Sequence, residues 1–264
     1  MNQRIHGIAG SRFLFLTIAV LLQCQQTEAG GRVPVIVEPF TSEGCSSCPP
    51  ADELLAELCK TQPVSGVEII PMELHVDYWN ELGWADPFSS SRFTERQNTY
   101  AGAFGNSRIY TPQMVVDGLA EFVGSNSTRA YEAIRRAAQA PKALVQVMSS
   151  QEGATKRSVS LSIQIQGLGS VVRDDTAEVV LAITEDGLSS KILRGENAGR
   201  KLSHTGVVRR FEVIGKVKAG QPDVFSVPAT ARLEDEWKRE HLRAVVWVQE
   251  CGRKRVVGAS SLPL

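Results

Sequence analysis

The sequence predicts an α/β domain followed by an all-β, sandwich-like domain, with the boundary near residue 141. In residues 31–140, apolar runs typical of buried strands alternate with segments of helical periodicity. In residues 142–264, apolar side chains recur at every second position in short runs that turn residues separate. The first predicted helix follows directly on a pair of cysteines, which makes that point of the chain the first place to look for chemistry.

The chain has 264 residues, of which 29 are acidic and 29 are basic, so its formal net charge is zero. This length provides one large or two modest domains with enough buried surface for a core. A neutral chain argues against nucleic acid and against an acidic membrane surface as partners.

Met1–Ala29 is predicted to be an export signal. Basic residues precede the apolar run Phe13–Leu22, which is too short to span a bilayer comfortably, and small residues before Ala29 provide a cleavage site. We therefore expect a periplasmic or secreted protein, in a compartment where disulfides persist. Lipid attachment at Cys24 is the alternative. Without it, no membrane contact is expected after cleavage.

Cys45 and Cys48 separate a predicted strand, Val33–Phe40, from a predicted helix that begins with Pro49 and Pro50. Proline is tolerated there because an N–H group in the first helical turn has no acceptor within the helix, so its absence costs no helical hydrogen bond. The helix has one apolar face, formed by Ala51, Leu54, Leu55 and Leu58.

This position favours thiol chemistry, because unpaired N–H groups and the positive end of the helix dipole both stabilise a thiolate. We expect Cys45 to attack a substrate disulfide and Cys48 to resolve the mixed disulfide. A permanently oxidised, structural Cys45–Cys48 disulfide is the alternative. A zinc half-site is less favoured, because no second cysteine pair follows at ligand spacing.

The remaining elements of the first domain follow in order. They are a strand at Val67–His75 interrupted by Pro71, a structured loop at Val76–Phe88, a helix at Ser89–Phe104, a hairpin that starts at Pro112 and turns at Asp117-Gly118, and a helix from Ser127 that stops at Pro141. This order resembles the thioredoxin fold, and the segment TPQMVVDG resembles its glutaredoxin-type version. The resemblance implies that Pro112 is cis, lies against the cysteine pair and acts with it, and that the Thr111 backbone pairs with a bound substrate chain.

Four motifs together resemble one exported bacterial family, labelled domain of unknown function 1223. They are FTSEGCSSCPPADELL, HVDYWNELGWADPF, YTPQMVVDG and GENAGRKLSHTGVVR. The resemblance covers the chain from about residue 33 to its end and implies a thioredoxin-like domain followed by a β-rich one. It implies no established substrate or reaction.

Three more residues are candidates for the site around the cysteines. Glu38, seven residues before Cys45, would accept the proton of Cys48 if it lay beneath the pair, or would be an ordinary exposed strand-end residue. His75 would stabilise a thiolate or bind substrate, or would make a structural hydrogen bond. Trp79 would form part of a substrate-binding rim, or would pack in a small core under its loop.

The second domain contains four alternating strands, within Ser158–Gln166, Ala177–Thr184, Val207–Val213 and Leu242–Val248, and predicts an antiparallel sandwich. Its one polar, glycine-rich loop, Leu193–Val208, either forms a long surface hairpin or folds back over the cysteine pair. Cys59 is expected to be buried as a small apolar residue. Whether Cys59 and Cys251 form a disulfide is a question that the sequence leaves open.

The leading functional prediction is an exported thiol–disulfide oxidoreductase that needs no cofactor and acts on a protein or on a small thiol or disulfide. A second hypothesis is a protein that binds or delivers a soft metal such as Cu(I) through Cys45, Cys48 and His75. A third is a non-catalytic binding module with a structural disulfide.

Overall fold

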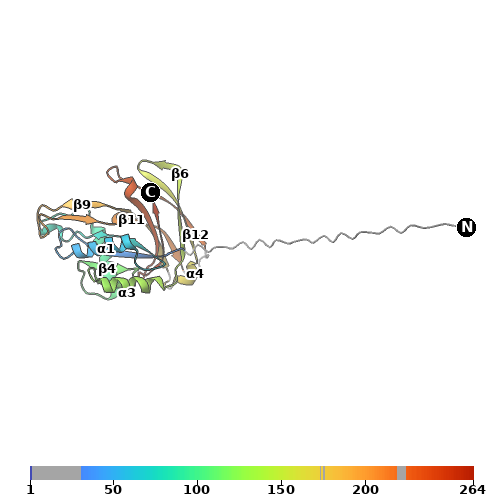
Figure 1. Cartoon of the computed structure of the whole chain (residues 1–264), viewed down its shortest axis with the longest axis horizontal. Coiled ribbons are helices and arrows are strands. Elements are labelled where there is room, and N and C mark those ends of the chain that lie inside the picture. The colour runs from blue at the N-terminus through green and yellow to red at the C-terminus, as the bar shows by residue number, and fades with distance from the viewer. Residues whose placement is uncertain (2–30, 173, 175, 219–223) are drawn as a thin grey trace. The chain divides into compact units, whose positions relative to one another are not determined.

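A computed structural model describes Met1 and residues 31–172, 174, 176–218 and 224–264. Strands contain about 44% and helices about 21% of these residues. Gly31–Leu264 forms one compact unit (Figure 1). Apart from Met1, the predicted export signal and Cys24 lie outside the described residues. Among the helices that are described, none combines the length and the apolar character needed to cross a membrane.

The strand β1, Val33–Thr41, forms the centre of a five-stranded sheet. It pairs in parallel with β2, Val67–Pro71, and with β3, Leu74–His75. It pairs antiparallel with β4, Gln113–Val116, which forms a hairpin with β5, Ala120–Val123. Because β1 has neighbours on both edges and packing on both faces, its last seven residues are buried.

Helices pack on both faces of this sheet. α1, Pro49–Thr61, and α3, Ser127–Ala138, cover one face, where Leu55 and Ile134 belong to the same apolar cluster as Val35 and Val37. α2, Ser91–Phe104, contributes Phe93 and Tyr100 to the cluster on the other face. The helix start at Pro49 and Pro50 and its apolar face confirm the local predictions for α1.

The second half of the chain forms three antiparallel sheets. The four-stranded sheet contains, in order, β11 (Val207–Lys218), β8 (Thr176–Glu185), β13 (Leu242–Glu250) and β14 (Val256–Pro263). The three-stranded sheet contains β12 (Val224–Arg232), β7 (Ser158–Gln166) and β6 (Leu144–Thr155). The two-stranded sheet pairs β9 (Leu188–Lys191) with β10 (Lys201–His204). The short helices are α4, Leu168–Val171, and two 3-10 turns, Asn80–Leu82 and Arg239–His241.

The prediction of an α/β thioredoxin-like domain followed by an all-β, sandwich-like domain is wrong. The described chain consists mostly of strands in several sheets, most of them antiparallel, and helices are a minor part. The cause is visible in β8, whose side chains are buried on both faces. Val179 and Leu181 pack toward the three-stranded sheet, as the alternation indicates, but Val180 and Ala182 pack with β1 and α2. The four-stranded sheet therefore belongs to both cores.

Smaller predictions also differ in detail. α2 begins at Ser91, two residues after its predicted start, and is capped by Ser90, whereas α3 begins at Ser127 as predicted and is capped by Asn126. Each cap side chain accepts a hydrogen bond from a backbone N–H of the first turn, which is what stabilises a helix start. Cys59 and Cys251 are free thiols, so the bridge between them is not formed.

Candidate functional site

Cys45 and Cys48 form a disulfide in the turn that joins β1 to α1, and their Cα atoms are 5.4 Å apart. Two backbone hydrogen bonds shape this turn, from Cys45 N to Ser42 O and from Cys48 N to Cys45 O. Cys48 is the N-cap residue of α1. The pair therefore stands at the end of a helix where backbone N–H groups lack helical partners, as its sequence spacing predicts.

Both cysteines are completely buried, whereas Ser46 and Ser47 between them are exposed. The hydroxyl of Ser47 lies 3.4 Å from the sulfur of Cys45. A disulfide with no exposed surface cannot meet another molecule unless a neighbouring segment moves. The residues that cover it therefore belong to the site.

The segment 192–200, between β9 and β10, is one such cover. Asn197 donates hydrogen bonds from Nδ2 to the carbonyl oxygens of Glu43 at 2.9 Å and Cys45 at 3.0 Å. Glu196 accepts a hydrogen bond from Ser46 N at 3.1 Å. Arg200 donates to the Asn197 side-chain oxygen at 3.0 Å and so orients the amide. The sequence allowed either a surface hairpin or a loop that folds back over the cysteine pair. The structure combines the two, because the loop belongs to a hairpin and also contacts the cysteine turn.

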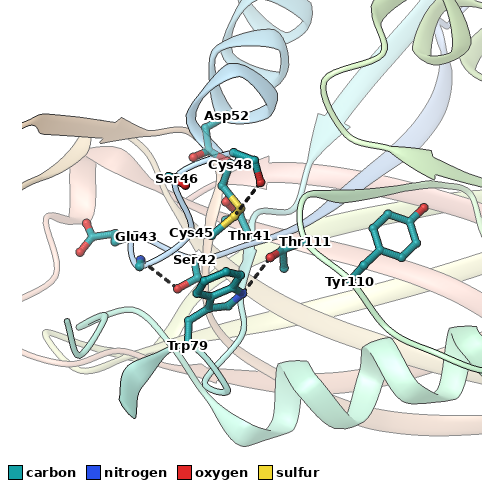
Figure 2. Close-up of a disulfide and its surroundings, with 12 residues drawn as sticks. Thr41, Ser42, Glu43, Cys45, Ser46, Cys48, Asp52, Trp79, Tyr110 and Thr111 are labelled. Atoms are coloured by element: carbon teal, nitrogen blue, oxygen red, sulfur yellow. Dashed lines mark hydrogen bonds between the residues drawn. A yellow bond between two sulfur atoms is a disulfide. The ribbon is translucent and has the colours of Figure 1, made fainter. Parts of the chain in front are cut away.

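A buried carboxylate lies next to the cysteines at Asp52, in the first turn of α1 (Figure 2). Its Oδ1 accepts a hydrogen bond from Thr41 Oγ1 at 2.8 Å, and its backbone N–H donates to Cys48 O. Burial, with a smaller contribution from the charge of Glu73, raises the pKa of Asp52 to about 7. A carboxyl group with this pKa can exchange protons with a thiol near neutral pH.

Glu38, the predicted proton acceptor, is buried but has other partners. Its Oε2 lies 2.6 Å from Arg96 Nε, and its Oε1 accepts a hydrogen bond from Tyr100 OH at 2.5 Å. Both partners belong to α2, on the face of the sheet opposite α1. Glu38 is thus held in an ion pair on the side away from α1, whereas Asp52 lies on α1 itself.

The Thr111–Pro112 peptide bond is cis, as the resemblance implies. Trp79 connects this segment to the cysteine turn, because its Nε1 donates to Thr111 Oγ1 at 2.8 Å while its side chain packs beside Gly44 (Figure 2). A Cβ atom added to Gly44 would lie 3.2 Å from Trp79 Cβ, a tight contact that glycine avoids. Trp79 and Thr111, both predicted to bind substrate, thus lie together beside the cysteine pair.

His75 is fully buried in a group of acidic and histidine side chains. Its Nδ1 lies 2.7 Å from Asp86, its Nε2 lies 3.4 Å from Glu73, and its ring lies edge-on to that of His204. Burial opposes a charge on His75, but Asp86 and Glu73 outweigh it and raise its pKa well above the usual value. Among the described residues, the group with metal-ligand geometry is Glu73, His75 and His204, and neither cysteine belongs to it. The predicted Cu(I) set of Cys45, Cys48 and His75 is therefore not assembled.

Sequence reasoning missed Asp52 and Glu73, and it pointed to Asn197 and His204 only as part of the polar loop Leu193–Val208. An acidic residue in a first helical turn is common, so Asp52 carries no signal in the sequence. Glu73 meets His204 because it bridges to Val207, in the second half of the chain, and no sequence spacing encodes that pairing. For Asn197 and His204, the polar content of the loop Leu193–Val208 was the available signal.

The chain matches the family described as "Protein of unknown function (DUF1223)" over residues 36–249. No curated protein matches it in sequence.

Two solved structures resemble it at a TM-score of 0.65 each. One is the X-ray structure of an Agrobacterium tumefaciens protein, with 26% identity over 87% of this chain and 94% of that one. The other is HBP35 of Porphyromonas gingivalis, with 14% identity over 88% of this chain and 76% of that one, which indicates a shared fold alone. Since the family match spans most of the sequence, the protein is a member of the DUF1223 family.

Proposed function

We propose that the protein is a thiol–disulfide oxidoreductase that works through Cys45 and Cys48. The observation that carries the proposal is the disulfide at the start of α1 with the buried Asp52 carboxyl group beside it. The helix start stabilises a thiolate, and Asp52 supplies a group that can take up or release a proton near neutral pH.

In one direction the reaction oxidises the protein. The Cys45 thiolate attacks one sulfur of a substrate disulfide, forms a mixed disulfide and releases one substrate thiolate. Asp52 then accepts the proton of the Cys48 thiol, and the Cys48 thiolate attacks Cys45 Sγ. This step forms the Cys45–Cys48 disulfide and releases the second substrate thiol, so two electrons pass from the protein to the substrate. The reverse sequence oxidises a dithiol substrate.

Burial of both cysteines imposes a condition on this chemistry. We infer that a substrate reaches the sulfur atoms when the segment around Glu196 and Asn197 withdraws from the cysteine turn. Four contacts hold the segment there or orient it, and all are hydrogen bonds of 2.9–3.1 Å. Trp79 and Thr111 then provide an aromatic and a hydroxyl surface beside the opened pair.

The compartment and the partner form part of the same proposal. The basic and apolar pattern of Met1–Ala29 supports export to an oxidising compartment, with a protein or a small thiol or disulfide as substrate. The alternative at Cys24, lipid attachment, would place the same chemistry at a membrane surface.

The test is a redox titration in glutathione buffers, with thiol trapping, of a Cys59→Ser/Cys251→Ser variant in which only Cys45 and Cys48 titrate. A two-electron couple between roughly −120 and −270 mV, together with turnover of a disulfide substrate that Cys45→Ser abolishes, is the expected result. A couple below roughly −300 mV with no turnover would identify a structural disulfide and overturn the proposal.

A further inference from the structure

Five buried side chains form a polar cluster behind the cysteine turn, and its members come from distant parts of the chain. They are Glu43, Glu73, His75, Asp86 and His204, each at most 4% exposed. Charged and imidazole groups are rarely buried unless they are paired or bind an ion. The way these five share their hydrogen bonds separates them into an inner and an outer set.

The inner set consists of three atoms that face one another. Glu73 Oε1 lies 3.4 Å from His75 Nε2 and 2.8 Å from His204 Nδ1. One donor atom from each of the three residues lies within 4.8 Å of the others. Zinc bonds of 2.0–2.1 Å in tetrahedral geometry place neighbouring ligand atoms about 3.3 Å apart. The inner atoms therefore have roughly the spacing that a single metal ion requires.

The outer set orients the inner one. Asp86 holds the far nitrogen of His75, Nδ1, at 2.7 Å, and Glu43 holds the far nitrogen of His204, Nε2, at 3.1 Å. The second oxygen of Glu73 accepts a hydrogen bond from Thr205 N at 2.8 Å. A carboxylate on the far nitrogen of each histidine is the arrangement that surrounds metal-binding histidines in general, because it fixes the ring and its tautomer.

One inner atom provides an independent sign of a missing ligand. Among the described residues, His75 Nε2 is one of the few buried side-chain polar atoms without a hydrogen-bond partner. Its residue has no exposed surface, and the atom points toward Glu73. Leaving a buried polar atom without a hydrogen bond costs free energy, and its contact with Glu73 Oε1 is long at 3.4 Å, so the atom is available to a ligand such as an ion.

We propose that Glu73, His75 and His204 bind one divalent transition-metal ion of the zinc type. Two imidazole nitrogens and one carboxylate oxygen suit Zn²⁺, whereas Ca²⁺ and Mg²⁺ require oxygen ligands and Cu(I) prefers thiolates. Three protein ligands leave a fourth position on a tetrahedral ion. A cavity of about 690 Å³ is lined by His204 and Thr205 together with Pro71 and Asp186, so it borders one of the three ligand residues.

The site is distinct from the cysteine pair and does not depend on the proposed redox function. The test therefore uses metal binding itself. EDTA-treated full-length protein is titrated with Zn²⁺ against a chromophoric chelator, and with Co²⁺, whose visible absorption is strong in tetrahedral sites. We expect one Zn²⁺ per chain, a tetrahedral Co²⁺ spectrum, and much weaker binding of Ca²⁺.

Variants assign the ligands. Glu73→Gln and His204→Gln, which keep side-chain size and hydrogen bonding close to the original, should each weaken Zn²⁺ binding at least about 100-fold. Asp86→Asn should weaken it about 10- to 100-fold, as loss of an orienting carboxylate does elsewhere. His241→Gln is the matched control, because His241 does not belong to the group with metal-ligand geometry, and it should bind as the wild type does.

A measurement on the unaltered protein covers the case in which a variant fails to fold. Imidazole nitrogen NMR of the wild type should show Zn²⁺ shifting the signals of His75 Nε2 and His204 Nδ1 while His241 stays unchanged. The proposal is overturned if no Zn²⁺ binds, if binding survives both Glu73→Gln and His204→Gln, if Cys45→Ser/Cys48→Ser or His241→Gln abolishes it, or if the two imidazole signals do not move.

Discussion

Asn197 donates a hydrogen bond from its side-chain nitrogen to the carbonyl oxygen of Cys45 at 3.0 Å, although 152 residues separate the two in the chain. The same nitrogen also donates to the carbonyl oxygen of Glu43. One buried amide therefore ties the β9–β10 hairpin to the turn that carries the disulfide. Loosening this connection is therefore one way to expose the disulfide.

The first prediction concerns access to the disulfide. Asn197→Ala removes both hydrogen bonds, each worth about 1 kcal/mol, so the open state of the cover should be populated at least about ten-fold more. Reduction of the Cys45–Cys48 disulfide by excess dithiol should be faster by a similar factor. The rate is measured by timed alkylation of the released thiols and mass spectrometry.

Arg194→Ala is the control for Asn197→Ala, since Arg194 lies in the same loop with an exposed side chain. It should leave the reduction rate unchanged. Equal rates in Asn197→Ala and in the wild type would mean that the loop does not limit access, and the opening would then have to be sought at Ser46 and Ser47.

The second prediction concerns proton transfer. If Asp52 accepts the proton of Cys48, the resolving step should accelerate as pH rises through about 7, the pKa of Asp52, and then level off. In Asp52→Asn the step should be slower by about ten-fold or more at pH 7, and its pH dependence should follow the thiol instead. Stopped-flow kinetics of the reduced protein with a fluorescent disulfide substrate reports this profile.

Glu53→Gln is the matched control for Asp52→Asn. Glu53 follows Asp52 directly in α1 but is exposed, so this variant removes a similar charge near the helix start without touching the buried position. It should keep the wild-type pH profile. A profile that is the same in Asp52→Asn and in the wild type would show that another group takes the proton.

The sequence predicted the parts of the site that depend on local spacing. Cys45 and Cys48 at a helix start, Pro49 and Pro50 in the first turn, and cis Pro112 are recognisable from a few consecutive residues, directly or by resemblance. Such features need only the chain near them. They were therefore expected correctly even though the fold class was wrong.

The parts that depend on burial and on distant pairing were not predictable. The alternation in β8 indicates one buried face, but Val180 and Ala182 on the other face are buried too, because the sheet built around β1 lies against them. Likewise, Glu38 and Asp52 are both acidic residues near the cysteines in sequence. Only the packing of α2, with Arg96, determines that Glu38 is held in an ion pair.

The third prediction concerns stability and pH. Asp52 in the folded protein keeps its proton up to about pH 7, whereas in the unfolded chain it loses the proton near its usual pKa of about 3.9. Between pH ~4 and about 7 the folded state binds more protons than the unfolded chain. The stabilisation that protonated Asp52 contributes is therefore complete below pH ~4 and is lost as pH rises to about 7. From pH 5 to pH 8, Asp52→Asn should therefore gain on the order of 2 kcal/mol relative to the wild type.

Urea unfolding of both proteins at pH 5, 6, 7 and 8 measures this difference, because the comparison cancels groups that titrate alike in both. The Thr41 hydroxyl can still donate to the side-chain oxygen of asparagine, so the variant keeps that contact. A stability difference that stays constant with pH would contradict a raised pKa at Asp52.

The fourth prediction separates the two carboxylates. Arg96 and Glu38 form an ion pair with 11% and 0% of their side chains exposed, so Arg96→Met leaves a buried carboxylate without its cation. This should cost about 3–5 kcal/mol, measured by urea unfolding, whereas the double variant Glu38→Gln/Arg96→Met should cost less because no charge is left unpaired. Neither change should move the redox potential of the cysteine pair, since the ion pair lies on the far side of the sheet from α1. If Glu38→Gln/Arg96→Met instead shifted the redox potential of the cysteine pair and left stability unaltered, Glu38 would have to be part of the redox site.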